Sequence, residues 1–285
     1  MNIICSDRDT TEEKVMRATI LVDNRKKDDL PGEWGLSIYI EADGHTILLD
    51  TGASELFCSN AKRLGLPIDK VEAAVLSHAH YDHANGMRAF FEANGTAPFY
   101  VRETTAENCY FKKWFLHKYI GIPKHILGEY RDRIIYAKGD TLLWDGIYLI
   151  PHKTPGLSEN GKRERMYQKR KGRWYPDDFS HEQSLVVDTE KGLVIFNSCS
   201  HGGAANIINE VAKTFPDKKI YGLVGGFHLF NKTEEEIRAL GMQIKQTDIP
   251  YVCTGHCTGG RAYAILKEEL GERLHGMQVG FTIEV

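Results

Sequence analysis

Three histidines and one aspartate lie within six residues of this chain, in the stretch His78-Ala79-His80-Tyr81-Asp82-His83. Neutral imidazole and carboxylate are the ligands that borderline divalent metal ions prefer. A bound metal ion lowers the pKa of a water molecule, so this group could make hydroxide available near neutral pH. The pattern therefore predicts a metal site, and the simpler alternative is a polar loop that happens to be rich in histidine.

An apolar run directly before this cluster indicates which element positions it. Residues 71–76 read Val-Glu-Ala-Ala-Val-Leu, a pattern typical of a buried strand, and Ser77 ends the run. The metal ligands then lie on the loop at the carboxyl end of that strand. Such a loop can arrange side chains at its first, third, fifth and sixth positions around one point.

The remaining predicted elements fall into two halves, and the helices and strands follow the same order in each half. Each half has a hairpin, a polar loop, a helix, and then a strand that leads into a loop with histidine. The first half has strands 18–23, 36–41, 45–49, 71–76 and 98–102 and helices 54–64 and 84–93. The second half has strands 183–188, 192–197, 219–224, 251–253 and 278–284 and helices 204–214, 234–246 and 261–270. This repetition favours two sheets packed face to face with helices outside.

Two histidines of the second half are candidates to complete the site. His201 follows strand 192–197 and precedes two glycines, and His256 follows the strand that ends at Cys253. Both lie at carboxyl ends of strands, in equivalent positions of the second half. We therefore expect both to be metal ligands, although a structural role is commoner for a lone histidine in a loop.

The amino-acid composition excludes several classes of protein. Hydrophobic residues make up 42% of the 285 residues, and the net charge of −3 gives no overall basic field for nucleic acid. No apolar run approaches the roughly 20 residues of a membrane span. The six cysteines show no dense disulfide spacing, which favours a reduced, cytoplasmic protein. We expect residues 1–17 to be a disordered extension and residues 18–285 to form a single domain.

The motif His78–His83 resembles that of the metallo-β-lactamase superfamily. The resemblance implies an α/β fold, the four-layer αββα sandwich. In that family the first two histidines of the motif bind one metal ion, and the aspartate and third histidine bind a second. Carried over, His78 and His80 would hold metal one, and Asp82 and His83 would hold metal two.

The chain departs from the familiar family pattern at two places. Lys153 stands where a later histidine ligand is usual, and Ser198-Cys199-Ser200-His201 replaces the Gly-Asp pair that carries the bridging carboxylate. We interpret His201 as the replacement that completes metal one and His256 as the third ligand of metal two. His152 is the alternative substitute.

These departures resemble one branch of the superfamily. The stretches that carry this likeness are Glu182-Gln183-Ser184-Leu185, Ser198-Cys199-Ser200-His201, Gly225-Gly226-Phe227-His228-Leu229 and Gly255-His256-Cys257-Thr258-Gly259. The branch contains the archaeal dihydropterin ribofuranosyl-aminobenzene 5′-phosphate synthase and many uncharacterised bacterial relatives. The likeness runs from about residue 20 to the end of the chain, and it does not specify one reaction.

Several further residues are candidates for supporting roles. Asp50 resembles the family's buried aspartate that orients a metal-bound histidine, with a helix N-cap as the alternative. We expect His228 to lie in the pocket as a catalytic residue that binds substrate or a leaving oxygen, and a structural histidine is the alternative. His181 is expected to be structural, and Cys253 and Cys257 are expected to pack in the core.

Two insertions, near residues 103–131 and 157–181, are predicted to form a lid. They combine aromatic residues with many lysines and arginines, which would attract an anionic substrate. The alternative is a solvated charged loop plus an amphipathic helix.

Residues and resemblance together imply a hydrolase with two divalent metal ions, zinc first and iron or manganese as alternatives. Its activated hydroxide would attack a small anionic substrate, such as a pterin or a phosphorylated compound, with Asp82 orienting the hydroxide. One alternative is a metal-binding sensor or scaffold without turnover. Another is an enzyme that cleaves RNA or other phosphodiesters, although nucleic acid and membrane partners are not expected.

Overall fold

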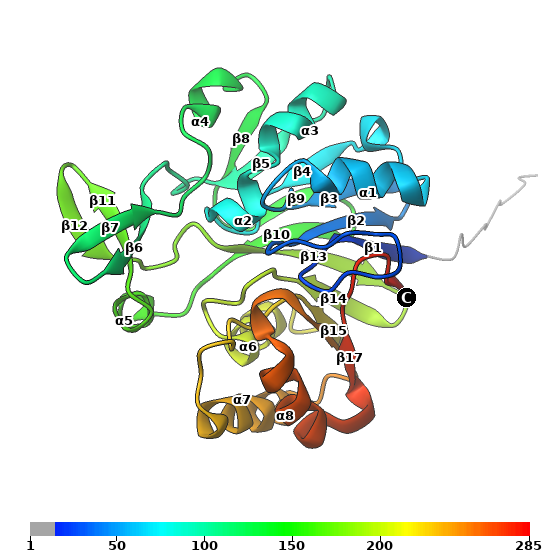
Figure 1. Ribbon diagram of the computed structural model, residues 1–285. Helices are drawn as coiled ribbons and strands as arrows, with labels where there is room; N and C mark the ends of the chain where they lie inside the picture. The colour runs from blue at the N-terminus through cyan, green and yellow to red at the C-terminus, as the bar shows by residue number, and fades with distance from the viewer. Residues whose placement is uncertain (1–14) are drawn as a thin grey trace, which may run out of the picture.

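The computed structural model describes residues 15–285, and its centre is a pair of seven-stranded sheets packed face to face (Figure 1). The first sheet has the order β18-β1-β2-β3-β4-β5-β8. Its strands are β1 Met16–Val22, β2 Ser37–Ala42, β3 His45–Leu49, β4 Ala73–Val75, β5 Phe99–Arg102, β8 Ile134–Ala137 and β18 Thr282–Glu284. The second sheet has the order β17-β16-β15-β14-β13-β10-β9. Its strands are β9 Thr141–Trp144, β10 Ile147–Pro151, β13 Gln183–Thr189, β14 Gly192–Phe196, β15 Ile220–Val224, β16 Tyr251–Thr254 and β17 Leu274–Gly276.

The two sheets repeat one pattern of strand directions. β1, β2 and β3 are antiparallel, and β4, β5 and β8 continue from β3 in parallel. β10, β13 and β14 are likewise antiparallel, and β15, β16 and β17 continue in parallel. Hairpin β2–β3 turns at Asp43 and Gly44, whose φ angles of 49° and 76° suit a two-residue turn. The predicted repetition of the two halves is confirmed.

Helices cover the outer faces of both sheets. The longer helices are α1 Leu56–Leu64, α3 Met87–Ala93, α6 Ala204–Thr214, α7 Glu234–Gln246 and α8 Gly260–Leu270. Shorter segments are α2 Tyr81–Ala84, α4 Ile126–Glu129, α5 Leu157–Arg163, η1 Ile68–Lys70, η2 His256–Thr258 and η3 Gly271–Arg273. In Figure 1, α1 and α3 lie above the first sheet, and α6, α7 and α8 lie below the second. No helix within residues 15–285 has the length and apolar character needed to cross a bilayer.

Three apolar cores hold these four layers together. Successive side chains of a strand point to opposite faces, so each sheet contributes to two cores. Ile47 of β3 and Phe196 of β14 pack between the sheets. Leu48 packs under α1 and α3, and Ile195 packs under the helices of the second half. The predicted αββα sandwich is confirmed.

Three boundaries differ from the sequence prediction. The expected helix 84–93 breaks between α2 and α3, because the carbonyl of His83 accepts hydrogen bonds from the backbone N–H and the hydroxyl of Thr51. The expected extension 1–17 is too long, since β1 begins at Met16, whose backbone pairs with Val285; residues 1–14 lie outside the described part. The last strand covers only Thr282–Glu284.

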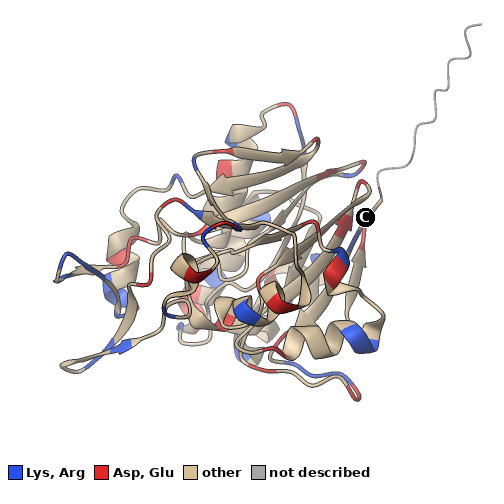
Figure 2. Ribbon diagram, turned by 90° about the horizontal axis from the view of Figure 1, so that it is seen from above, with Lys and Arg blue, Asp and Glu red and all other residues tan. Residues whose placement is uncertain are grey.

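The two insertions form a third sheet together. It has the order β12-β11-β6-β7 and consists of β6 Cys109–Lys113, β7 Leu116–Tyr119, β11 Met166–Arg170 and β12 Arg173–Pro176. β6 of the first insertion pairs with β11 of the second, and α5 precedes β11. This sheet projects from the sandwich at the left of Figure 1, and Figure 2 shows lysine and arginine along its hairpins. These segments are therefore mainly paired strands rather than a loop, and they carry exposed charge and the helix α5 as that alternative expected.

Candidate metal centre

The loop after β4 brings the predicted ligands to one edge of the sandwich. The loops after β14 and β16, which carry His201 and His256, reach the same edge, because the carboxyl ends of the two sets of parallel strands meet there. The side chains of all six predicted ligands are buried, and the residue most exposed among them, Asp82, has 8% relative exposure. The predicted ligands therefore share one desolvated site.

His78, His80 and His201 form the first group. Their ring centroids are 4.7 to 5.1 Å apart, and among the described residues no protein group makes a hydrogen bond to any of the three Nε2 atoms. Burial lowers the pKa of His80 to about 4 and lowers the pKa values of His78 and His201 well below their ordinary value. The rings are therefore neutral at pH 7, which is the form that binds metal. Buried nitrogens without partners are rare in native proteins, so these three atoms fit a metal ion.

Asp82, His83 and His256 form the second group. The Nε2 atoms of the two histidines are 3.2 Å apart, and Oδ2 of Asp82 lies 3.8 Å from the first and 3.5 Å from the second. Ligands at about 2.0–2.1 Å from a tetrahedral ion lie roughly 3.3 Å from one another. The spacing of this group therefore fits a second metal ion.

Asp50 orients the second group. Its carboxylate is fully buried and accepts hydrogen bonds from Nδ1 of His83 at 2.8 Å and from the hydroxyls of Ser77 and Ser198. The expected contact with a ligand histidine is thus present. The alternative role as a helix N-cap is wrong, because Glu33 instead accepts from the backbone N–H groups before α1.

Three supporting residues were not found from the sequence. Trp34 donates its Nε1–H to Oδ2 of Asp82 at 2.9 Å. The backbone N–H of His256 donates to Asp23 at 2.8 Å, and Nδ1 of its ring lies 3.1 Å from Oδ1 of Asn24. Asp23 and Asn24 end a predicted strand and could have been found by the same signal as His201. Trp34 lies in a loop without such a signal.

His152 does not lie in either group. Its ring is held between the carboxylates of Glu182 and Glu210, and Glu182 also accepts from the backbone N–H groups of His201 and Gly202. Burial lowers the pKa of His152, but the charge of Glu182 outweighs it and raises the pKa to about 9. The two carboxylates engage both ring nitrogens of His152, so the structure does not support the alternative in which His152 is a metal ligand. It instead supports the loop that carries His201.

His181 supports the metal loop from the other side. Its Nδ1 accepts a hydrogen bond from the backbone N–H of Ala79 at 3.1 Å, and its Nε2 lies 3.2 Å from Oδ2 of Asp177. Both ring nitrogens are therefore engaged, and His181 also lies in a cluster of possible metal ligands with His80, Cys109 and Asp177. The pair fixes the backbone between His78 and His80.

Two cavities adjoin the site, and His228 lines both. The first, of about 270 Å³, is bounded by the ligands His80, Asp82 and His201 and by side chains of the third sheet. The remaining lining residues are Trp34, Tyr81, Phe111, Ile120, Met166, Cys199, Phe230 and Cys257. Cys257 is buried in the core as expected and also borders this cavity, and Cys253 lies between the sheets.

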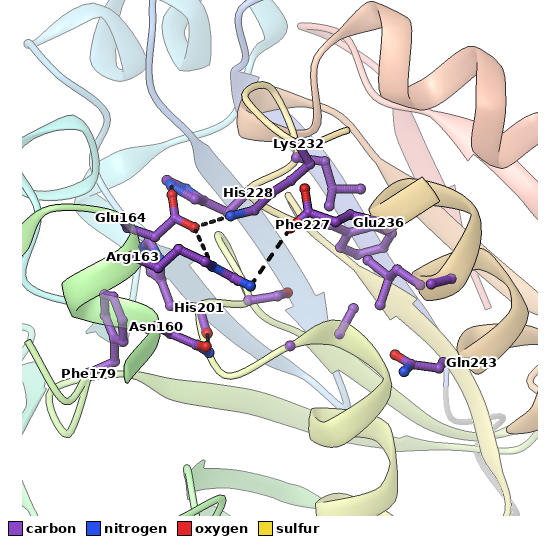
Figure 3. Close-up of a pocket in the computed structure, with 16 residues that line it drawn as sticks. Asn160, Arg163, Glu164, Phe179, His201, Phe227, His228, Lys232, Glu236 and Gln243 are labelled. Carbon is purple, nitrogen blue, oxygen red and sulfur yellow. Dashed lines mark hydrogen bonds and ion pairs between the residues drawn. The ribbon is translucent and has the colours of Figure 1, made fainter. Parts of the chain in front are cut away.

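The second cavity lies beyond His201 and His228, and its lining combines apolar and charged side chains (Figure 3). Arg163 and Lys232 line it together with Glu164 and Glu236. Nε2 of His228 lies 3.8 Å from Glu164, and its Nδ1 is buried with no hydrogen-bond partner in the described chain. The predicted pocket position of His228 is thus observed.

A buried, histidine-rich centre at one edge of an αββα sandwich defines a class of metal-binding proteins. The chain belongs to the metallo-beta-lactamase superfamily, whose family profile matches residues 34–196. The resemblance drawn from the motif His78–His83 is thereby confirmed, and proteins of this family typically bind divalent metal ions.

Two proteins of Methanocaldococcus jannaschii resemble this chain over most of its length. The 7,8-dihydropterin-6-methyl-4-(beta-D-ribofuranosyl)-aminobenzene-5′-phosphate synthase is 27% identical over 265 residues, which cover 88% of this chain and 89% of the synthase. An uncharacterised protein is 28% identical over 258 residues, which cover 87% of this chain and 93% of that protein. The predicted branch is therefore supported.

Solved structures give the same fold. A metal-dependent hydrolase of the beta-lactamase superfamily matches with a TM-score of 0.80 and 29% identity, over 95% of this chain and 99% of its own. Zinc-bound PqqB from Methylobacterium extorquens matches with a TM-score of 0.56 and 10% identity, over 94% of this chain and 100% of its own. The second likeness shows the fold alone.

Proposed function

We propose that this protein is a hydrolase with two metal ions that acts on a small anionic substrate. The observation that carries the proposal is the pair of buried ligand groups, one with three unpartnered Nε2 atoms and one with ligand atoms 3.2 to 3.8 Å apart. Both groups border a cavity large enough for part of a small molecule.

Each ligand group has a defined role in this proposal. His78, His80 and His201 hold metal one, and Asp82, His83 and His256 hold metal two, with zinc as the first candidate. Bound ions would lower the pKa of a water molecule and stabilise negative charge that develops on the substrate. Three imidazole or carboxylate ligands would leave room at each ion for further ligands, such as water or substrate, as in catalytic sites.

The protein's own side chains orient the reactants. Asp82 accepts a hydrogen bond from Trp34 and lies 3.5 Å from the ring of His256. Its carboxylate lines the cavity, where it could accept a hydrogen bond from water. His228, between the two cavities, is placed to donate a hydrogen bond to the substrate or to a leaving oxygen. Its Nδ1 has no protein partner in the described residues, so it is available for that bond.

Three observations support a phosphorylated substrate or a pterin. Arg163 and Lys232 line the cavity beside His201 and pair there with Glu164 and Glu236; these cationic side chains would bind an anionic group that enters the cavity. The similar archaeal synthase carries a dihydropterin and a 5′-phosphate in its name. Trp34, Phe111 and Phe230 line the first cavity and offer aromatic surfaces to a flat ring.

Metal analysis and a substrate screen test the proposal. We expect about two metal ions per chain after loading with zinc, and about one in His256→Ala. The metal-loaded protein should hydrolyse at least one of four classes of compound: phosphomonoesters, phosphodiesters, lactones or thioesters. One or no metal ion in carefully loaded wild-type protein would rule out the dinuclear site, and two ions without turnover would favour a sensor.

Asp82→Asn tests the proposed catalytic role directly. The amide is a weaker, neutral ligand that cannot accept the same charge-assisted hydrogen bonds, so kcat should fall by roughly 100-fold or more while the fold is kept. Circular dichroism provides the check on folding. Activity within a few-fold of the wild type would place Asp82 outside the reaction.

A synthase reaction is the second candidate, because the archaeal relative that bears the synthase name matches 88% of this chain. A dihydropterin and a phosphorylated ribose compound, supplied together and separately, distinguish the two. Consumption that requires both compounds would indicate a synthase, and consumption of a single ester or lactone would indicate a hydrolase.

A further inference from the structure

Cys199 lies at the junction of the two ligand groups. Its Sγ and the donor atoms of His78 and His201 all lie within 4.8 Å of one another, and the same holds for Sγ with His83 and His256. The Sγ atom is 3.3 Å from Nε2 of His83. No other side chain in the described residues belongs to both of these groups.

The backbone around Cys199 is fixed on both sides. Asn197 donates to Ser184 at 2.9 Å and accepts from the backbone N–H of Ser200 at 2.8 Å. Ser198 donates its hydroxyl to Asp50 at 2.5 Å, which ties this loop to the carboxylate that orients His83. The loop therefore holds Cys199 in place, 3% exposed and lining the first cavity.

We propose that the thiolate of Cys199 bridges the two metal ions, at the place where familiar relatives carry a bridging carboxylate. This inference rests on the proposed dinuclear function. A thiolate has several lone pairs and binds zinc at about 2.3 Å, so one sulfur between the groups can serve both ions. A metal ion deprotonates a thiol that coordinates it.

The identity of this bridge determines which metals the site accepts. Thiolate is a soft ligand and favours zinc, Fe(II) or Co(II), whereas manganese and magnesium prefer oxygen ligands. The exchange of a carboxylate for Cys199 therefore selects against manganese. Replacing Cys199 by aspartate should reverse part of that preference.

Cys257 is a second cysteine close to the two ligand groups, and it could be mistaken for the bridging residue. Its Sγ lies 3.3 Å from Sγ of Cys199 and accepts a hydrogen bond from the backbone N–H of His228 at 3.2 Å. It shares a ligand-sized cluster with Cys199 and His228, but with neither histidine pair of the two groups. Cys257 thus supports the loop of His228, and it provides a matched control.

Spectroscopy of the loaded protein tests this assignment without relying on activity. Zinc-loaded wild-type protein should show sulfur at about 2.3 Å by X-ray absorption. The Co(II) form should show the intense near-ultraviolet charge-transfer band of thiolate coordination. Cys199→Ser should lose both signals, and Cys257→Ser and Cys58→Ser should keep them.

Metal competition adds a second readout. Cys199→Asp should raise the affinity for manganese relative to zinc by at least the roughly 10- to 100-fold that changes around a metal site produce. Two zinc ions without sulfur in their shell would overturn the bridge and leave the dinuclear proposal standing. Failure to bind metal at all would overturn both. Loss of the thiolate band in Cys257→Ser but not in Cys199→Ser would also overturn the bridge.

Discussion

At the scale of residues, hydrogen bonds to neighbouring side chains hold the candidate ligands in place. Nδ1 of His83 is bonded to Asp50, and Nδ1 of His256 lies against Asn24. Ser77 makes the corresponding contact to His78 at 2.8 Å. Such outer partners set the orientation of each ring and contribute to metal affinity.

Strained backbone accompanies these ligands. Asp50, Ser200, His228 and His256 have φ angles of 47° to 58°, in the left-handed region that non-glycine residues rarely adopt. Each such residue costs roughly 1–3 kcal/mol, and the surrounding hydrogen bonds must hold it. These four are among the twelve non-glycine residues with positive φ in the described chain, and all four lie at or beside the two groups.

We expect Trp34→Phe to weaken metal two. Phenylalanine keeps most of the ring but loses the hydrogen bond to Asp82, so metal affinity should fall by roughly 10- to 100-fold. Competition with a chelator measures the effect. Trp144→Phe is the matched control, because Trp144 stacks on His45 outside both cavities; equal losses in the two variants would contradict the role of Trp34.

At the scale of elements, the loop after β14 depends on a buried ion pair. Glu182 accepts two backbone hydrogen bonds from this loop and is neutralised by His152. A Cβ atom on Gly202 would lie 2.6 Å from the ring of His152, so the loop also packs closely on that ring. His152 therefore links β10 to the backbone of His201.

Replacing His152 by alanine should destabilise the protein by about 3–5 kcal/mol, because it leaves Glu182 buried without its partner. Urea denaturation measures the change. His117→Ala is a control, since His117 lies in the third sheet and stacks on Trp174. A loss below about 1 kcal/mol in His152→Ala would show that Glu182 is neutralised by another group.

The same pair predicts a pH dependence. The pKa of His152 is about 9 in the folded protein, above the ordinary 6.5, so its stabilising contribution is complete below about pH 6.5. It is lost as the pH rises through about 9. Unfolding free energy of the wild type should therefore fall between these values, and His152→Ala should lack that part of the fall. Parallel profiles for both proteins would contradict the assignment.

Arg163 at the end of α5 should influence substrate capture. It lines the second cavity, where it lies 3.5 Å from Glu164 and 3.7 Å from Glu236. Arg170 is instead bonded to Asp178, and Arg173 lies on the β11–β12 hairpin. Arg163→Gln should raise KM for an anionic substrate by up to about fivefold, the effect of roughly 1 kcal/mol, with little change in kcat. Arg173→Gln should leave KM unchanged. Equal KM values in both variants would show that Arg163 does not contribute to substrate capture.

At the scale of the whole molecule, the core between the sheets holds the two halves of the site together. Phe196 is fully buried in that core and directly precedes the loop with Cys199 and His201. Phe196→Ala should cost about 3–5 kcal/mol in metal-free protein, measured by urea denaturation. Leu142→Ala, at a position 61% exposed, should cost less than about 0.5 kcal/mol. Similar losses of unfolding free energy in the two variants would show that Phe196 does not hold the sheets together.

The sequence by itself determined the fold and both sets of candidate ligands. Local patterns were sufficient, because a buried strand followed by polar residues marks its own carboxyl end. His78 to His83 are close in sequence, and the glycines beside His201 and His256 indicate tight loops. The turn residues Asp43 and Gly44, which are adjacent in sequence, likewise predicted the hairpin.

Only the tertiary structure decided which distant side chains meet. Cys199 and Cys257 are 58 positions apart, and Trp34 and Asp82 are 48 apart, so no local pattern relates them. The two insertions pair into one sheet through β6 and β11 for the same reason. His152 carries a charge because two glutamates from other segments surround it, and that depends on packing. Periodicity reports how a segment folds, whereas contacts between segments depend on the full three-dimensional arrangement.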